Sequence, residues 1–109
     1  MANYISSRPP GENRQFHLPQ DLAIGTAESM TLRQFNDEVI GLNRAKPFRI
    51  IGSASDTNDT NVARHMTELV GDRVTPKRDA ITLKAGDVIY VVTFQGNTAQ
   101  YARHRVSGK

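Results

Sequence analysis

The sequence predicts one small α/β domain, in which a mixed β-sheet carries two main helices packed mostly on one of its faces. The length of 109 residues suits a single domain, so we expect residues 1–109 to fold as one unit. Apolar residues recur at helical spacing in 32–42 and 59–70, and β-branched residues cluster in 48–52 and 88–95. The order of strand, long loop, helix, strand, helix and two strands is typical of a mixed sheet with helices on one side.

The N-terminal quarter begins with a short strand and continues as a long connection. Residues 2–6 have the apolar and aromatic character of a strand. Residues 7–27 are rich in Pro, Gly, Asn and Gln, and a Pro-Pro-Gly run at 9–11 interrupts regular structure. We therefore expect a long loop over 7–27, with a short strand at 14–18 or at 21–24 as the alternative. Connections of this length are often functional or mobile.

The first helix is predicted over 32–42, ending near Asn43. Thr31 and Gln34 form a capping-box pattern, in which each side chain bonds the backbone N–H of the other residue. The apolar residues that follow recur three or four positions apart, at Leu32, Phe35, Val39 and Leu42. This spacing places them on one face, which we expect to lie against the sheet.

The second helix is predicted over 59–70, directly after a polar segment. Residues 53–60 supply hydroxyl, amide and carboxylate groups that can cap the helix N-terminus. The apolar face of this helix consists of Val62, Met66, Leu69 and Val70. Gly71 is the expected stop, because glycine adopts the left-handed conformation that ends many helices.

The C-terminal third predicts a hairpin and a tail. Residues 80–84 alternate in polarity and 85–87 read as a turn, so we expect them to pair with the strand at 88–95 as a β-hairpin. Residues 98–109 are polar and basic, and we expect a basic tail there.

Composition limits the classes of partner. The chain has no cysteine, which excludes a disulfide framework, a thiolate nucleophile and a cysteine-based zinc site. No apolar run reaches the roughly 20 residues that span a bilayer, so we expect no membrane partner. Arginine supplies ten of the fourteen basic residues, and its planar guanidinium suits phosphate and carboxylate groups. The net charge of +3 is too small to indicate duplex nucleic acid.

The histidines are the only candidates for acid–base catalysis that the sequence suggests. His17, His65 and His104 lie far apart and show no ligand spacing, so we expect neither a metal nor a cofactor. His65, at the edge of the apolar face of the second helix, and His104 are the candidate general acids or bases. A histidine at the edge of the core is the ordinary alternative for His65.

The polar segment 53–60 is a candidate anion site. It precedes a helix N-terminus, whose free N–H groups and positive dipole end suit a phosphate. The carboxylates of Asp56 and Asp59 oppose an anion at that point, so ordinary helix capping is the alternative.

Several segments together resemble a known family. The strand reads Phe48-Arg49-Ile50-Ile51-Gly52-Ser53, and after a Thr/Asn-rich loop the helix ends in Glu68-Leu69-Val70-Gly71. Residues 74–87 then read Val-Thr-Pro-Lys-Arg-Asp-Ala-Ile-Thr-Leu-Lys-Ala-Gly-Asp before an apolar strand. With Tyr4-Ile5-Ser6-Ser7 at the first strand, most of the chain resembles the viral ring-nuclease anti-CRISPR family of archaeal viruses and bacteriophages.

The resemblance implies a ligand and an assembly. Members of that family are small α/β homodimers that bind cyclic tetra-adenylate in a groove across the dimer and cleave it without a metal. By this resemblance we expect a homodimer or higher homo-oligomer, with the ligand facing the first strand, the polar loop and the end of the 88–95 strand. With two arginines from the basic clusters, the candidate ligand-binding residues are Ser6, Ser7, Gly52, Ser53, Ser55, Thr57, Asn58, Thr60, Arg78, Gln95, Asn97 and Arg103.

One position separates this chain from the chemistry of that family. Ser53 stands where the family has its catalytic histidine, and a serine does not protonate a leaving oxygen near neutral pH as imidazole does. We therefore predict a viral anti-defence protein in the cytoplasm of the infected host cell, which binds and sequesters a cyclic nucleotide or oligonucleotide messenger. Two alternatives stay open. One is a direct protein-binding inhibitor of a host defence complex, and the other is a metal-independent cyclic-oligonucleotide phosphodiesterase that uses His65 or His104.

Overall fold

The computed structural model describes residues 2–41 and 48–109. Its strands are β1 (Asn3–Ser6), β2 (Phe16–His17), β3 (Leu22–Ile24), β4 (Glu28–Met30), β5 (Arg49–Ile51), β6 (Pro76–Lys77), β7 (Ile81–Thr82), β8 (Val88–Gln95) and β9 (Thr98–Gly108). Its helical segments are η1 (Pro10–Glu12), α1 (Leu32–Phe35), η2 (Asn36–Ile40) and α3 (Thr57–Val70). The predicted short strands at 14–18 and 21–24 both exist, as β2 and β3, within the long connection.

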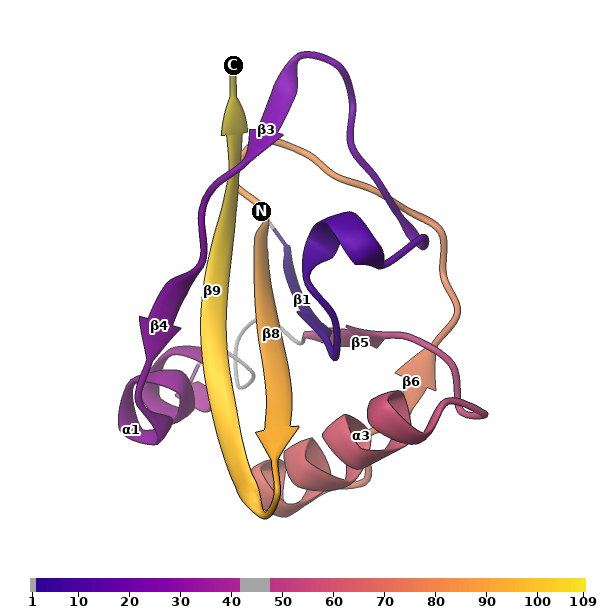
Figure 1. Cartoon of the computed structure of the whole chain (residues 1–109), viewed down its shortest axis with the longest axis vertical. Coiled ribbons are helices and arrows are strands. Elements are labelled where there is room, and N and C mark those ends of the chain that lie inside the picture. The colour runs from indigo at the N-terminus through magenta and orange to yellow at the C-terminus, as the bar shows by residue number, and fades with distance from the viewer. Residues whose placement is uncertain (1, 42–47) are drawn as a thin grey trace.

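Strand β1 lies inside a mixed sheet of seven strands, counted over the described residues. The order is β3-β9-β8-β1-β5-β6, and β4 also pairs with β9. Strand β1 is parallel to both β5 and β8, and β5 is parallel to β6, whereas β9 is antiparallel to β8. The carboxyl ends of β1, β5, β6 and β8 therefore lie at one edge of the sheet, near α3 (Figure 1). We call this the carboxyl edge. The predicted fold class is confirmed.

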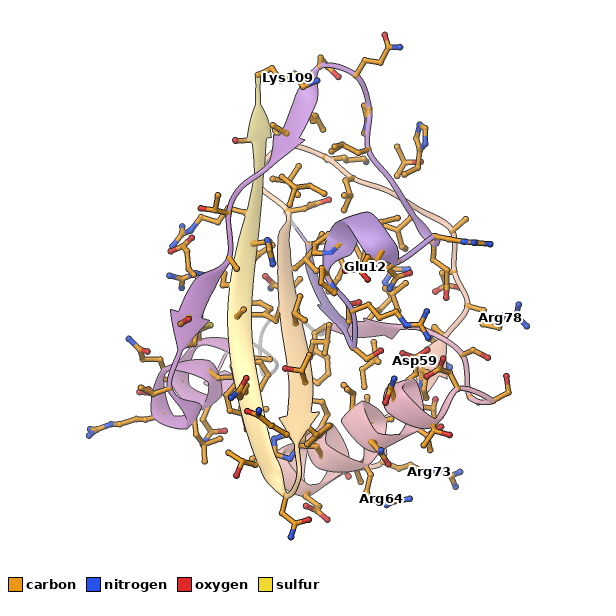
Figure 2. All side chains as sticks on the ribbon, in the orientation of Figure 1. Glu12, Asp59, Arg64, Arg73, Arg78 and Lys109 are labelled. Carbon is orange, nitrogen blue, oxygen red and sulfur yellow. The ribbon has the colours of Figure 1, made fainter. Side chains whose placement is uncertain are left out.

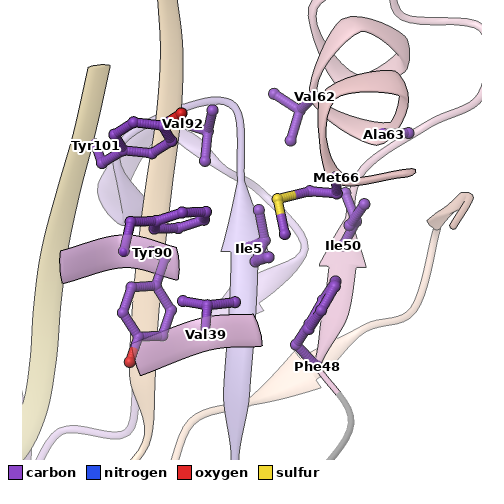
Figure 3. Packing of buried hydrophobic residues seen from close by; sticks show 11 residues of the cluster. Ile5, Val39, Phe48, Ile50, Val62, Ala63, Met66, Tyr90, Val92 and Tyr101 are labelled. Atoms are coloured by element: carbon purple, nitrogen blue, oxygen red, sulfur yellow. The ribbon is translucent and has the colours of Figure 1, made fainter. Parts of the chain in front are cut away.

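Both helices pack on the same face of the sheet, as predicted. Figure 3 shows Met66 reaching from α3 toward Ile5 and Ile50 on neighbouring strands. On α1, the ring of Phe35 stacks on Tyr101 of β9, with ring centroids 4.4 Å apart. The buried cluster on this face comprises Ile5, Phe35, Val39, Phe48, Ile50, Val62, Ala63, Met66, Tyr90, Val92 and Tyr101.

The first helix begins where predicted, but one of its predicted core residues is exposed. Thr31 and Gln34 form the capping box, with N–H to side-chain oxygen distances of 2.8 and 3.1 Å. Segment α1 continues into η2, where the wider π-helical turns shift the phase of the side chains. Leu32 is 51% exposed, so its predicted place in the core is wrong. It is the first helical residue, directly after β4, and the described part of the chain leaves it uncovered. The predicted Leu42 and Asn43 lie outside the described residues.

The second helix starts two residues earlier than predicted and ends where predicted. Asp56 caps it, because its carboxylate accepts a hydrogen bond from the N–H of Asp59 at 3.1 Å. Gly71 ends it with φ of 85°, a left-handed conformation that other residues adopt only with strain.

The predicted hairpin between 80–84 and 88–95 is wrong. Strand β7 leaves the main sheet and pairs in parallel with β2, and these two strands cover part of the face opposite the helices. The turn that separates β7 from β8 is held by the buried carboxylate of Asp87, which accepts hydrogen bonds from the N–H groups of Ala2 and Lys84. The hairpin partner of β8 is β9, through a turn at Gly96 and Asn97.

The predicted basic tail over 98–109 is also wrong, because residues 98–108 form β9. This strand pairs with β8 along its length from Thr98 to Arg105, and with β4 and β3 on its other side. Its arginines are compatible with a strand because acidic residues from other elements neutralise them, as described below. Among the described residues, no helix is both long and apolar enough to cross a membrane.

Two residues of α1 test this arrangement. We expect Phe35→Ala to lower the free energy of unfolding by about 3–5 kcal/mol, because it empties a fully buried site. The matched control Leu32→Ala, in the same helix, is expected to cost less than about 1 kcal/mol. Urea denaturation of both variants measures the difference, and equal losses would contradict the packing described for α1.

Candidate functional site

A hollow of about 270 Å³ lies at the carboxyl edge of the sheet, and we call it the edge hollow. Ligand sites of open α/β sheets commonly form at this edge, where loops leave the strands in different directions. Its walls come from the chain after β1, the turn after β5, the first turn of α3 and the residue after β6. The lining residues are Arg8, Glu12, Asn13, Arg14, Gln15, Gly52, Ser53, Asp56, Asp59 and Arg78.

The carboxylate of Asp59 joins three of these walls. It is 8% exposed, and its two oxygens accept hydrogen bonds from the N–H of Ser53 at 2.8 Å and from the hydroxyl of Ser7. Gly52 makes this contact sterically feasible, since a Cβ there would lie 2.5 Å from the Asp59 carboxyl carbon. Asp59 therefore occupies the N–H group of Ser53, within the polar segment that the sequence suggests as an anion site.

The side-chain amides of Asn13 and Gln15 fix the wall that follows η1. Asn13 donates to the hydroxyl of Ser6 at 3.0 Å and to the carbonyl of Ile51 at 3.1 Å, which ties the wall to β1 and β5. Gln15 donates to the carbonyl of Lys77 at 3.1 Å, which ties it to β6. These long-range bonds hold the first part of the predicted long loop in one conformation against the sheet edge.

Some charged side chains around the edge hollow form ion pairs and others do not. Arg8 pairs with Asp56 at 2.6 Å, so these two charges neutralise each other. Asp59 is satisfied by the hydrogen bonds described above. Within residues 2–41 and 48–109, neither Arg14 nor Arg78 forms an ion pair, and Glu12 forms none either. Figure 2 shows Glu12 above Asp59, with Arg78 to their right.

A smaller hollow of about 180 Å³ lies between the start of α3 and the end of β8, and we call it the side hollow. It is lined by Ser7, Asn58, Val62, Val92, Thr93 and Phe94. Ser7 lines the side hollow while its hydroxyl bonds Asp59 of the edge hollow, so this pair stands between the two spaces. The ring of Phe94 is 38% exposed, and the His65 ring lies edge-on to it at 5.5 Å.

The structure brings five of the predicted ligand-binding residues to these two hollows. Gly52, Ser53 and Arg78 line the edge hollow, and Ser7 and Asn58 line the side hollow. These residues come from the ends of different strands and from α3, so the fold brings them together although they lie apart in the sequence.

Other predicted residues lie nearby without lining either hollow. The Ser55 hydroxyl bonds that of Ser53 at 2.8 Å, and the Thr60 hydroxyl donates to the Asp56 carbonyl at 2.7 Å. Thr57 is the exposed first residue of α3. Gln95 and Asn97 lie at the turn between β8 and β9.

Two predicted residues require correction. Ser6 is fully buried, and its hydroxyl donates to the Arg8 carbonyl at 2.7 Å, so it stabilises the turn after β1 and is not accessible to a ligand. Arg103 lies beside η2 and β4, where it pairs with Glu28 and Glu38. These bonds lower the pKa of Glu28 and raise the pKa of Arg103. Arg103 is thus a structural ion-pair residue, away from both hollows.

The two candidate catalytic histidines are engaged elsewhere. His65 Nε2 hydrogen-bonds the hydroxyl of Tyr101 at 2.6 Å, and burial lowers the pKa of His65 against a smaller opposite effect of Glu68. His104 Nδ1 bonds the carbonyl of Gly25 at 2.9 Å, and in the sheet it lies opposite Ile89, near the amino end of β8. Neither histidine lines the edge hollow or the side hollow.

Sequence reasoning missed the contribution of the long connection. Arg8, Asn13, Arg14 and Gln15 line the edge hollow, yet they were assigned only to a loop. Two arginines flanking a Pro-Pro-Gly run were the available signal. Among the described residues, no group of three or more histidine, cysteine or acidic side chains is placed to hold a metal ion.

Two comparisons with known proteins found no match to this sequence. No protein-family model matches the sequence, and a search of curated proteins finds no match either.

The fit between Gly52 and Asp59 can be tested directly. We expect Gly52→Ala to lower the free energy of unfolding by about 1–3 kcal/mol, because the new methyl group displaces a buried, hydrogen-bonded carboxylate. Gly11→Ala is the control, since a Cβ at that position meets open space. Urea denaturation of both variants would contradict the described junction if Gly52→Ala were as stable as the control.

The depressed pKa of His65 predicts a pH-dependent stability. The folded-state pKa lies below the ordinary value of 6.5, so the unfolded chain binds the proton first as the pH falls. The stability that the fold gains from keeping His65 neutral is therefore complete when the pH is above 6.5, and it decreases as the pH falls below that value. We expect His65→Gln to lose less stability than the wild type between about pH 7 and about pH 5. Equal pH slopes in urea denaturation would show that His65 is not protected by burial.

Proposed function

We propose that this protein binds a cyclic nucleotide or oligonucleotide across the edge hollow and the side hollow, and that it holds the ligand intact. The observation that carries the proposal is the pair of arginines at the carboxyl edge, Arg14 and Arg78, which have no ionic partner among the described residues. Arginine is well suited to phosphate oxygens, because its guanidinium donates two parallel hydrogen bonds.

The arginines favour one side of this edge for an anion. The lining of the edge hollow holds three arginines and three carboxylates, so its formal charge is zero, and Asp59 keeps its negative charge because its hydrogen-bond donors are neutral. Arg8 and Asp56 neutralise each other, whereas Arg14 and Arg78 form no ion pair among the described residues. Because the carboxylates of Asp56 and Asp59 lie at the start of α3, a phosphate would bind on the side of Arg14 and Arg78.

The side hollow supports a nucleotide over a simple anion. Phe94 offers a half-exposed aromatic ring, on which a base can stack. Asn58 lines the same space, and its amide can donate to and accept from a base edge. Ser7 lines one hollow and bonds Asp59 of the other, so the two spaces adjoin at this pair, and one nucleotide could place its phosphate in one and its base in the other.

Two observations support binding without cleavage. Ser53 lines the edge hollow at the position where the resembling family has its catalytic histidine. His65 and His104 lie outside both hollows and are hydrogen-bonded elsewhere. The resemblance itself supports the messenger of an antiviral defence system as the ligand, and a protein that holds such a messenger lowers its free concentration by sequestration.

A ligand panel tests the proposal. We expect one member of a set of cyclic di-, tri- and tetranucleotides and cyclic ADP-ribose variants to raise the melting temperature and to be recovered unchanged by chromatography after heat denaturation. Arg14→Ala and Arg78→Ala should each weaken that binding by about 10- to 100-fold, through loss of charge-assisted hydrogen bonds. Phe94→Ala should weaken it by about 10-fold or more, through loss of stacking.

Arg33→Ala is the matched control, because Arg33 is an exposed arginine of α1 outside both hollows. Binding that this control weakens as much as Arg78→Ala would indicate general charge attraction and overturn the site. Linear products would establish cleavage instead. The absence of a shift with every ligand would overturn the nucleotide proposal.

A further inference from the structure

A third concave surface lies along α3, and its lining shares no residue with the two hollows described above. It is a groove of about 570 Å³ between α3 and the segment that leads into β6, and we call it the flank groove. Its lining residues are Ala54, Thr60, Ala63, Arg64, Thr67, Arg73, Val74, Thr75 and Pro76. The proposed nucleotide site uses none of these residues, so this surface needs an explanation of its own.

The floor and the walls of the flank groove are small, apolar and fixed in place. Ala63 is buried on α3, and Val74 and Pro76 are half-buried on the facing segment. The hydroxyl of Thr67 donates to the Ala63 carbonyl at 2.8 Å and accepts from the N–H of Val74 at 3.0 Å. This bridge joins the helix to the facing segment, so the groove is formed before any partner binds.

Two arginines border this apolar floor. Arg64 and Arg73 are exposed, and within the described residues neither forms an ion pair. Figure 2 shows both side chains projecting on the same side of the molecule, next to α3. None of the nine lining residues is acidic. The groove therefore combines an apolar floor with an unneutralised positive border.

We infer that the flank groove docks an acidic segment of a partner protein, which places an apolar side chain on the floor and carboxylates on Arg64 and Arg73. The charge of the border favours an acidic occupant, because guanidinium groups bind carboxylates by paired hydrogen bonds. The apolar floor requires a side chain to cover it, which a small free anion does not provide.

Two other occupants fit the surface less well. A second copy that presented the same groove would set its own arginines against Arg64 and Arg73, and like charges at the centre of an interface are strongly unfavourable. An added β-strand would pair with the free edge of β6, but Pro76 has no N–H group and blunts that edge. Contact through side chains of an acidic segment is the arrangement that remains.

The flank groove and the edge hollow share one loop. Ala54 lines the groove, while Ser53 and Asp56 line the edge hollow. A bound partner would therefore contact the loop that forms one wall of the proposed nucleotide site. The docking inference does not depend on that site, and its test uses the protein without any nucleotide.

A phage-displayed library of random peptides is the probe for the test. We expect selection on the wild-type protein to enrich peptides that combine Asp or Glu with a large apolar residue. A fluorescein-labelled synthetic copy of an enriched peptide should then bind in a fluorescence anisotropy titration, and replacing its apolar residue by glycine should abolish most of the binding.

Charge-reversal variants locate the peptide. Arg64→Glu and Arg73→Glu should each weaken binding by about fivefold to tenfold, whereas Arg33→Glu, the same change at an exposed position of α1, should change it less than about twofold. Circular dichroism confirms that each variant is folded. Amide shifts on peptide addition should concentrate on residues of the flank groove, such as Thr67 and Thr75.

Three results would overturn the inference. The first is selection that enriches no acidic and apolar peptides. The second is an equal loss of affinity in Arg64→Glu, Arg73→Glu and Arg33→Glu, which would show attraction to net charge alone. The third is amide shifts that concentrate on the edge hollow, at residues such as Arg14 and Ser53, which would place the acidic peptide in the proposed phosphate site instead.

Discussion

The carboxylate of Asp59 is the contact on which the carboxyl edge depends. It receives the N–H of Ser53 and the hydroxyl of Ser7, and so connects the start of α3 to the chain after β5 and the chain after β1. A buried carboxylate is stable only when its oxygens are hydrogen-bonded, and this one obtains its partners from segments far apart in the sequence. Gly52 is the residue that lets the carboxylate approach the backbone closely.

This contact also decides where an external anion can bind. In many α/β proteins a phosphate takes the free N–H groups at a helix N-terminus. Here the carboxylate of Asp56 already bonds one of those groups, the N–H of Asp59, and the carboxylate of Asp59 bonds the N–H of Ser53 in the preceding loop. Among the residues that the structure describes, Arg14 and Arg78 have no ionic partner, and they line the same hollow from the connection after η1 and from the end of β6.

The rest of the fold supports this edge by burying both faces of the sheet. One face packs against α1, η2 and α3, and the other packs in part against the β2–β7 pair. At the opposite side of the sheet, Arg103 is held between Glu28 and Glu38, and the hydroxyl of Tyr90 donates to Glu38 at 2.9 Å. This ion-pair cluster allows a strand as basic as β9 to lie against the core.

The sequence by itself determined the elements whose signals are local: the capping box at Thr31, the β8 strand, and a helix that ends at Gly71. It also pointed to the polar loop that contains Ser53, a residue that lines the edge hollow. Only the tertiary structure decided strand partners, the strand character of 98–108 and the ion pairs of Arg103, because neutralising charges and pairing edges come from distant segments. The arginines of the long connection, Arg8 and Arg14, line the edge hollow because Asn13 and Gln15 bond the carbonyls of Ile51 and Lys77. Such long-range bonds leave no local signal in the sequence.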